Sequence, residues 1–368
     1  MRPGVGPCVV TVRDGDVVDL TSRETPTVRD LTEHEDAAGY AASAKGDAFV
    51  SISALIANAD ETTRDAHKPY LLAPVDLQAV KASGVTFVTS LLERVIEEQA
   101  RGDASRAASL RDEIVGVIGT DLSQLTPGSP EADALKARLQ EKGVWSQYLE
   151  VGIGPDAEIF SKAQPMSAVG HGAFVGLHPV SKWNNPEPEV VLVVRSDGTT
   201  VGATLGNDVN LRDVEGRSAL LLGKAKDNNA SASLGPFIRL YSGAFGPHDV
   251  AKAEVSLEVT GEDGFTLEGS SSMGEISRAP DDLVAATIGA HHQYPDGLVL
   301  YCGTMLAPIK DRDGPGEGFT HHEGDVVRIA TPSLGGLVNR VTLSTKAPPW
   351  TFGTRALMGN LAQRGLLG

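Results

Sequence analysis

Three acidic side chains stand where they could share a metal ion. Glu187 and Glu189 come just before an apolar, β-branched run at residues 190–195, and Asp208 closely follows a second β-prone run at residues 199–205. Runs of this composition predict two β-strands. Whether the three carboxylates meet therefore depends on how the two strands pair.

An Asp-Gly pair at residues 197–198 separates the two runs and predicts a hairpin with a two-residue loop. This pairing places Glu187 opposite Asp208, and Glu189 points to the same face as Glu187 because side chains alternate along a strand. Like charges opposite each other are destabilising, so a divalent cation would make the cluster favourable. Hard oxygen ligands favour Mg²⁺, Mn²⁺ or Ca²⁺ over zinc. The alternative is a solvated acidic strand end, and a bulge near Pro188 would shift the register.

The composition restricts the partners of the chain. It has 368 residues, a formal net charge of −16 and a pI of about 5.0, so we expect neither a nucleic acid nor an anionic membrane as a partner. Its two cysteines, Cys8 and Cys302, are too few for a disulfide framework or a zinc site and fit a reducing compartment. The sequence shows no signal-peptide pattern and no run of about 18 apolar residues. We therefore expect a cytoplasmic protein.

The content of turn-forming residues predicts a β-rich fold. The chain has 41 glycines and 21 prolines, which favour many tight turns. Residues 8–20 predict a hairpin on the Asp14-Gly15 turn, and residues 71–75 resemble a connector. We expect a small N-terminal domain at residues 1–75 and a larger domain at residues 76–368, in the α+β class.

Three helices are predicted in a charged insertion at about residues 88–150. We expect them at residues 90–100, 104–118 and 130–143. Ser129 is a good N-cap for the third helix, Pro130 suits its first position, and Gly143 suits its end. The insertion is a candidate lid, and a plain helical cover over a sheet is the equal alternative.

Further strands are predicted in the second half of the chain. We expect a hairpin at residues 255–270 and strands at residues 298–302, 325–330 and 337–344. A helix at residues 280–293 would carry His291 and His292 in its last turn, where cations are favoured. The His321-His322 pair lies between glycines and is interpreted as a solvated loop. The tail from Pro348 is expected to lie on the surface.

Several motifs together make the sequence resemble the fumarylacetoacetate hydrolase superfamily over roughly residues 70–345. The motifs are Glu187-x-Glu189, residues 206–213, Lys226 upstream of Leu234-Gly235-Pro236, Gly303-Thr304, and residues 318–320 and 324–327. The resemblance implies a β-dominated roll with a smaller N-terminal domain, assembled as a homodimer or homotetramer. It also implies that Glu187, Glu189 and Asp208 bind Mg²⁺, with Mn²⁺ as an alternative, and that the metal binds a 2-oxo acid.

One departure from the family pattern bears on the reaction. Hydrolytic members carry Gly-x-Asn-Tyr-x-x-His-x-x-Glu before the lid helix, and the His–Glu pair activates water. The matching stretch here, residues 84–93, keeps the glutamate as Glu93 but has Ser90 in place of the histidine. A serine hydroxyl cannot accept a proton from water near neutral pH. The Gly-Val-Thr-Phe form and the loop at residues 183–189 instead resemble the family's dehydratases of 2-keto-3-deoxy sugar acids, which act in non-phosphorylative pentose oxidation.

The resemblance to these dehydratases implies a role for each residue. Lys226 is the candidate base, or the electrostatic partner of the negative charge that develops on the substrate. Glu93 is the candidate acid for the departing C4 hydroxyl, delivered by lid closure. The expected substrate-binding residues are Ser90, Asn185, Arg212 and Thr304. A 2-keto-3-deoxy-D-pentonate derived from D-xylonate or D-arabinonate would then give 2,5-dioxopentanoate.

Two other functions stay open. One is hydrolysis of an acylpyruvate or another 2,4-diketo acid, against which Ser90 counts. The other is a non-catalytic paralogue that binds 2-oxo acids, against which the carboxylates and Lys226 count. Each residue also has a plain alternative: a surface lysine for Lys226, a solvated helix face for Glu93 and a strand-end hydroxyl for Thr304.

Overall fold

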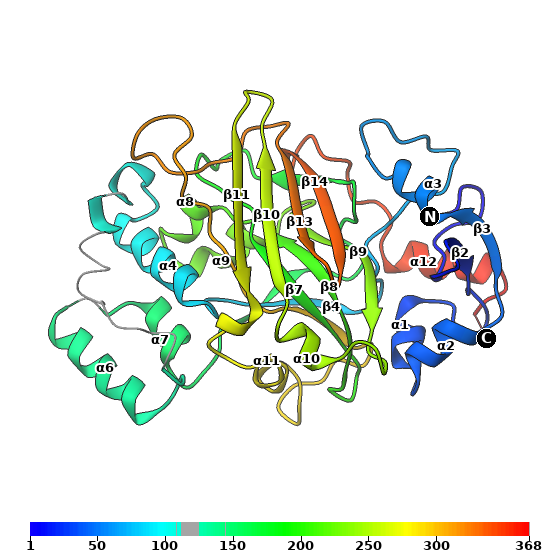
Figure 1. Cartoon of the computed structure of the whole chain (residues 1–368), viewed down its shortest axis with the longest axis horizontal. Helices are drawn as coiled ribbons and strands as arrows, with labels where there is room; N and C mark the ends of the chain where they lie inside the picture. The colour runs from blue at the N-terminus through cyan, green and yellow to red at the C-terminus, as the bar shows by residue number, and fades with distance from the viewer. Residues whose placement is uncertain (108, 112–124, 144, 368) are drawn as a thin grey trace.

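The computed structural model describes residues 1–107, 109–111, 125–143 and 145–367. Within these ranges the chain forms three β-sheets with helices at both ends of the molecule (Figure 1). The two larger sheets occupy the centre, a small sheet lies beside them near both termini, and a group of helices covers the opposite end. This arrangement confirms the α+β class.

The six-stranded sheet carries the acidic residues. Its order is β5 (Ile159–Ala163), β4 (Ala79–Ser83), β12 (Leu298–Tyr301), β7 (Pro188–Val194), β8 (Thr200–Asp208) and β9 (Ala232–Leu240). β12 runs parallel to β4, and the other neighbours are antiparallel. All seven residues of β7 are buried, as expected for a continuous apolar strand covered on both faces.

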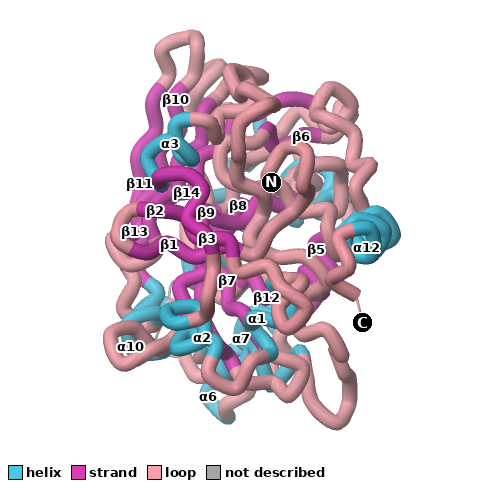
Figure 2. The backbone as a smooth tube through the Cα atoms, turned by 90° about the vertical axis from the view of Figure 1, so that its right-hand side faces the viewer, coloured by secondary structure: helices cyan, strands magenta, loops and turns pink. Residues whose placement is uncertain are grey.

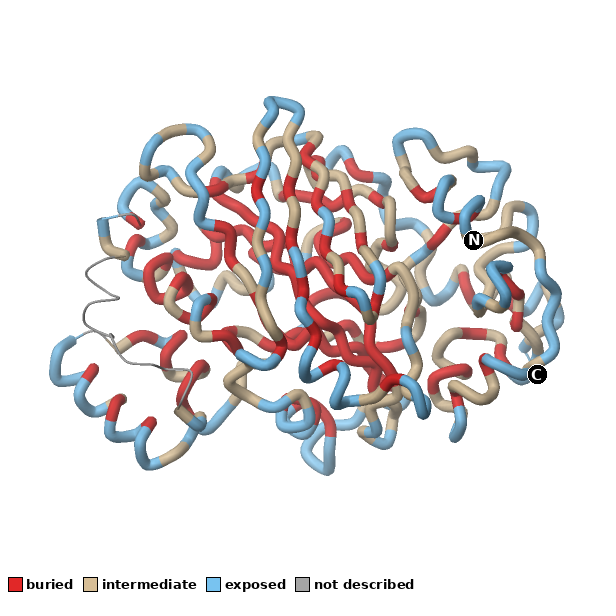
Figure 3. Tube along the Cα trace, viewed as in Figure 1, coloured by how far each residue is buried: buried red, intermediate tan, exposed pale blue. Residues whose placement is uncertain are grey.

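The five-stranded sheet supplies the other half of the core. Its order is β11 (Thr266–Ser272), β10 (Glu254–Thr260), β13 (Val326–Thr331), β14 (Gly335–Leu343) and β6 (Phe174–Leu177). Leu192 and Leu205 of the first sheet belong to one apolar cluster with Leu257, Ile329 and Leu337 of the second. The buried residues accordingly fill the space where the two sheets meet (Figure 3).

The β7–β8 hairpin reaches the predicted register by a different route. Its loop has three residues rather than two, because Arg195 pairs with Thr199. The register then shifts between Val193 and Val194. This β-bulge offsets the longer loop, so the far end of the hairpin pairs as predicted, with the Asp208 N–H donating to the Glu187 carbonyl at 3.0 Å. The predicted loop was wrong, and the predicted opposition of Glu187 and Asp208 is confirmed.

The N-terminal segment forms its own small sheet. Its elements are β1 (Val10–Arg13), β2 (Asp16–Asp19), α1 (Val28–Glu33), α2 (Ala37–Ser43), β3 (Asp47–Ser51) and α3 (Ile52–Ala57). The predicted hairpin on Asp14-Gly15 is confirmed, with φ values of 51° and 87° at these two residues. The division of the chain near residue 75 remains a prediction.

The C-terminal tail is helical and returns to the first residues of the chain. Helix α12 (Thr354–Gln363) lies close to the C-terminus and apart from β1, β2 and β3 in Figure 2. Arg364, just beyond the helix, donates to the Pro7 carbonyl at 2.7 Å, and Asn360 donates to the Val5 carbonyl at 2.9 Å. The tail therefore binds the first residues of the chain. The sequence analysis predicted only that the tail lies on the surface and did not predict this contact.

The predicted insertion is helical and has its own core. Its elements are α4 (Val88–Ala100), α6 (Pro130–Glu141) and α7 (Gln147–Ile153). Ile96, Leu139 and Leu149 belong to a separate apolar cluster that also contains Trp183. The predicted helix at residues 104–118 is helical at 104–107 and 109–111, and its remaining residues lie outside the described ranges. Closure of this insertion as a lid remains a prediction.

Short helices connect the strands of the two large sheets. They are α8 (Arg212–Glu215), η2 (Ala219–Leu221), α9 (Leu222–Lys226), α10 (Pro247–Val250), η3 (Met273–Glu275) and α11 (Pro280–Thr287). Helix α11 ends six residues before the predicted end because Ile288 is extended and buried in the core. His291 and His292 thus lie in a turn beyond the helix, and the predicted helix-terminus explanation for them was wrong. No helix within the described ranges has the length and apolar character that crossing a bilayer requires.

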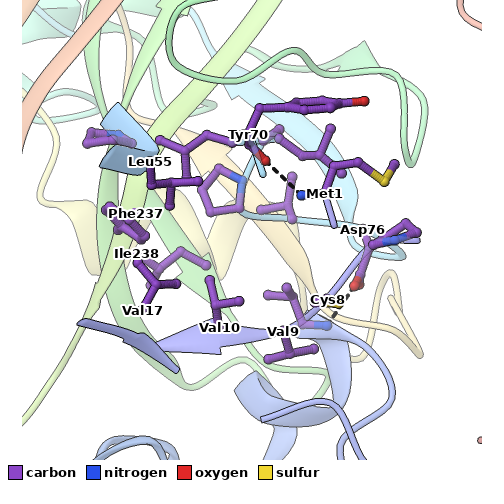
Figure 4. A pocket seen from close by; sticks show the side chains of 18 of the residues that line it. Met1, Cys8, Val9, Val10, Val17, Leu55, Tyr70, Asp76, Phe237 and Ile238 are labelled. Atoms are coloured by element: carbon purple, nitrogen blue, oxygen red, sulfur yellow. Dashed lines mark hydrogen bonds between the residues drawn. The ribbon is translucent and has the colours of Figure 1, made fainter. Parts of the chain in front are cut away.

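A cavity of about 1190 Å³ lies between the N-terminal sheet, β9 and the C-terminal tail (Figure 4). Apolar side chains such as Val17, Leu55 and Phe237 line it. The carboxylate of Asp76 at its edge accepts three backbone hydrogen bonds. None of the three acidic residues of the β7–β8 hairpin lines this cavity, so the cavity is separate from the predicted metal site.

The three-residue loop makes a prediction about stability. Gly198 has a φ of +88°, a conformation that favours glycine. We expect Gly198→Ala to lower the free energy of unfolding by about 1 kcal/mol, measured by urea denaturation. Gly243→Ala is the matched control, because Gly243 lacks a positive φ and no atom lies within 4 Å of its added Cβ. Equal effects of the two substitutions would contradict the strained-loop explanation.

Candidate active site

The β7–β8 hairpin brings the three predicted carboxylates together. One oxygen from each of Glu187, Glu189 and Asp208 lies within 4.8 Å of the others, and all three side chains are buried. Three buried carboxylates at this separation repel one another unless positive charge lies between them. An all-oxygen donor set of this size fits a hard divalent cation.

Three buried cations surround the carboxylates. Lys226 Nζ, at the end of α9, donates to Glu187 Oε2 at 2.5 Å and to Asp208 Oδ2 at 3.2 Å. Lys162 Nζ, on β5, lies 2.7 Å from Asp208 Oδ1, and Arg94, on α4, donates to Glu187 Oε1. Burial opposes ionisation of Asp208, but Lys162 and Lys226 hold its pKa below the ordinary value. Asp208 is thus kept as an anion.

Glu189 differs from the other two carboxylates because no cation contacts it among the described residues. It accepts a hydrogen bond from the Gly303 N–H at 2.6 Å and a longer one from Thr304 Oγ1 at 3.5 Å. Burial, followed by the charge of Asp208, raises its pKa well above the ordinary value. Of the three carboxylates, Glu189 is therefore the one whose negative charge a bound cation would stabilise most.

Two expected substrate-binding residues connect helix α4 to the acidic cluster. Ser90 Oγ donates to the Thr304 carbonyl, and the Thr304 hydroxyl faces Glu189. Both residues are buried. Their expected contacts with substrate remain a prediction, and the structure already gives each of them a protein partner.

Asn185 continues the ladder two residues beyond the pair Glu187 and Asp208. Its backbone exchanges two hydrogen bonds of 3.1 Å with Asn210. The Asn185 amide nitrogen donates to the Pro186 carbonyl, whereas its Oδ1 is buried and accepts no hydrogen bond from the described residues. This oxygen is available to a hydroxyl group, so the predicted role of Asn185 stays open.

Arg212 and Glu93 belong to a network of hydrogen bonds and ion pairs that connects helices α4 and α8. Arg212 donates to Glu97 at 2.6 Å, to Glu93 at 3.2 Å and to the Pro308 carbonyl at 3.0 Å, and it stacks on Trp183. Glu93 also accepts two hydrogen bonds from Arg111. These hydrogen bonds already occupy both carboxylate oxygens of Glu93. Both predicted roles stay untested, but these partners count against Glu93 as an acid and against Arg212 as a substrate ligand.

Glu158, which the sequence analysis did not identify, is a further acid–base candidate. It lies just before β5, and no described residue donates a hydrogen bond to its carboxylate. Burial, then the charge of Glu215, raises its pKa to about 7, while Lys226 opposes this shift. A Cβ on Gly84 would lie 1.9 Å from Glu158 Oε2, so the glycine in the first motif position provides the space for this carboxylate.

Four further charged residues of the site were also missed. They are Arg94, Glu97, Lys162 and Glu215, all buried. A signal existed for the first two, because helical spacing from Leu91 places Arg94 one turn further along the apolar face and Glu97 one turn beyond it. Lys162 follows Ser161 in β5, so its local sequence gives no clear signal of burial. Nothing in its local sequence distinguishes Glu215.

The two residues of the His321-His322 pair lie in different environments, one in the interior and one near the surface. His322 is partly exposed, whereas His321 is buried and its Nδ1 lies 3.1 Å from Asp325 Oδ2. Burial lowers the pKa of His321 despite this carboxylate. The predicted solvated loop was wrong for His321, because Asp325 and its partner Arg312 anchor the segment to the core.

Comparisons with known proteins agree with this geometry. The family described as "Fumarylacetoacetate (FAA) hydrolase C-terminal" matches residues 134–342. The chain is 32% identical over 207 residues to a probable 2-keto-3-deoxyxylonate dehydratase of Haloferax volcanii, covering 56% of this chain and 68% of that protein. It is 30% identical over 184 residues to a 2-dehydro-3-deoxy-D-arabinonate dehydratase of Saccharolobus solfataricus, covering 50% of this chain and 58% of that one.

Solved structures share the fold over a longer part of the chain. A 2-keto-3-deoxy-D-arabinonate dehydratase "complexed with magnesium and 2,5-dioxopentanoate" superimposes with a TM-score of 0.62. The superposition covers 91% of this chain and 94% of that one at 20% sequence identity. This similarity extends to the N-terminal segment, which the family match does not include.

The buried lysine on β5 makes a prediction about stability. Lys162→Met leaves Asp208 with one cation fewer in a buried site, so we expect a loss of about 3 kcal/mol in the free energy of unfolding, measured with chelator present. Lys81→Met, on neighbouring β4, is the control. Lys81 is not fully buried, and among the described residues its ammonium group bonds only to the exposed Ser161 hydroxyl. Similar losses in both variants would contradict a specific role of Lys162.

Proposed function

Because the chain belongs to the fumarylacetoacetate hydrolase family, we propose that it is a metal-dependent hydro-lyase acting on a 2-keto-3-deoxy sugar acid. The specific reaction that we propose is dehydration of a 2-keto-3-deoxy-D-pentonate to 2,5-dioxopentanoate. The buried cluster of Glu187, Glu189 and Asp208 with Lys226 against it is the observation that carries the proposal. The names of both curated relatives support the substrate class.

Glu187, Glu189 and Asp208 would hold Mg²⁺, or Mn²⁺ in its place. When bound, this ion would act as a Lewis acid on the keto carbonyl of the substrate and so increase the acidity of the C3 protons. Lys226 donates to two of these carboxylates, so its ammonium group is suited to stabilise negative charge rather than to accept a proton. We therefore favour the electrostatic of its two expected roles.

Glu158 is our candidate for proton transfer. A carboxyl group with a pKa of about 7 is present in both forms near neutral pH and can first accept and then donate a proton. It would take a C3 proton and return it to the C4 oxygen, so that the C4–O bond breaks and water leaves. Loss of a C5 proton and tautomerisation then give 2,5-dioxopentanoate.

Hydrolysis is the weaker alternative. Ser90 donates its only hydroxyl proton to the Thr304 carbonyl, and Glu93 is bound by two arginines. Neither residue is arranged to activate a water molecule, whereas dehydration needs no nucleophilic water. The neighbouring Lys226 and Glu158 also count against a protein that only binds a 2-oxo acid.

Further expectations belong to the same proposal. We propose a cytoplasmic homo-oligomer that acts in non-phosphorylative pentose catabolism. We also propose that residues 1–75 form a separate small domain. The order β1–β3 in a sheet of its own supports this division.

The metal requirement and the product test the proposal directly. We expect chelation to abolish turnover of 2-keto-3-deoxy-D-pentonate and Mg²⁺ to restore it, with 2,5-dioxopentanoate as the product. Glu187→Ala and Asp208→Ala should be nearly inactive, and the exposed Glu268→Ala should match the wild type. Release of pyruvate, or faster turnover of an acylpyruvate, would refute the dehydratase assignment.

The role of Glu158 predicts a pH dependence. The reaction begins with the deprotonated carboxylate, so kcat/KM should fall as the pH drops below about 7, the pKa of this group. Glu158→Gln should lose this acidic limb, and its rate should fall by about 10²-fold or more. Glu254→Gln, an exposed residue at the start of β10, is the control. An unchanged acidic limb in Glu158→Gln would exclude Glu158 as the proton-transfer group.

A further inference from the structure

Arg94 neutralises one of the three carboxylates from an unexpected position. It lies on helix α4, and its guanidinium group donates both to Glu187 and to Glu97. Its side chain is 7% exposed, and that of Glu187 is fully buried. A residue of the helical insertion is therefore bound directly to Glu187, the residue just before β7.

Glu215 offers this arginine a second place to bind. Glu215 Oε2 lies 3.4 Å from Arg94 Nη1 and 4.0 Å from Lys226 Nζ. This oxygen is buried and accepts no hydrogen bond from the described residues. Helix α8, which carries Glu215, lies against α4 (Figure 1). A buried, unsatisfied carboxylate oxygen next to a guanidinium group is a ready acceptor.

The charge balance explains why a second acceptor is useful. Without a metal ion, three cations already pair with the acidic cluster: Arg94 and Lys226 with Glu187, and Lys162 and Lys226 with Asp208. A bound divalent cation adds two positive charges to this buried cluster. An arginine cannot release its proton at any physiological pH, so the excess charge is relieved by moving the guanidinium group away from Glu187.

We propose that Arg94 is an exchangeable counter-ion of the metal site, which holds Glu187 in the metal-free protein and passes to Glu215 when the metal binds. This inference rests on the proposed metal site but not on the proposed substrate. Arg94 is a positioning residue, because it acts on the metal through Glu187. Its transfer couples metal binding to helix α4, which also carries Ser90 and its hydrogen bond to Thr304.

The affinity for Mg²⁺, measured by calorimetry without substrate, tests the exchange. Arg94→Met removes the competitor of the metal, so we expect Mg²⁺ to bind about tenfold more tightly. Glu215→Gln weakens the second acceptor, so we expect Mg²⁺ to bind several-fold more weakly. The double variant should behave like Arg94→Met, because the acceptor has no function without the arginine. Arg278→Met should leave the affinity unchanged, because within the described part of the chain this guanidinium group bonds only to backbone carbonyls.

Opposite changes in the two single variants support the exchange, since a merely structural role would weaken binding in both. Weaker binding in Arg94→Met would overturn it. If Arg94→Met does not fold, hydrogen exchange of the wild-type chain decides: Mg²⁺ should alter the exchange of residues 88–100 and 212–215, and no change there would also overturn the inference. If the wild type binds Mg²⁺ and both single variants bind it with the same affinity as the wild type, the exchange is refuted and the dehydratase proposal is unaffected. If the wild type fails to turn over the sugar acid, only the dehydratase proposal is refuted.

Discussion

The burial of like charges is the constraint on which the site depends. Three carboxylates of one hairpin lie within 4.8 Å of one another inside the protein, where water cannot screen them. Each source of compensation comes from a different part of the chain: Lys226 from α9, Lys162 from β5 and Arg94 from α4. The position of these elements around the hairpin is therefore an electrostatic requirement as well as a result of packing.

The hairpin itself is fixed at its two ends in different ways. Near the loop, an additional loop residue and a β-bulge offset each other. Near the acidic cluster, the ladder is regular and continues to the pair Asn185 and Asn210. The loop at residues 196–198 is partly exposed, whereas Glu187, Glu189 and Asp208 lie at a fully buried end of the hairpin. The geometry of the carboxylates is therefore set where packing allows little variation.

The helical insertion is bound to the site by charges rather than by apolar contact alone. Arg212 on α8 bonds to Glu93 and Glu97 on α4, and Arg94 on the same helix bonds to Glu187. In our proposal the insertion therefore contributes to the charge balance of the metal site in addition to excluding water from it. A dehydration with no nucleophilic water is compatible with a site buried in this way.

The sequence by itself determined the features that depend on neighbouring residues. The composition of β7 and β8 and the Asp-Gly turn predicted that Glu187, Glu189 and Asp208 meet, although the loop length and the compensating β-bulge were decided by the structure. Cap residues also located the start of α6. The tertiary structure alone decided the partners of these groups, because Arg94 and Lys226 meet Glu187 from 93 and 39 residues away. It likewise buried His321 against Asp325, ended α11 at Ile288 and brought Glu158 into the site. Such contacts follow from the packing of whole sheets and helices, which local composition and spacing do not predict.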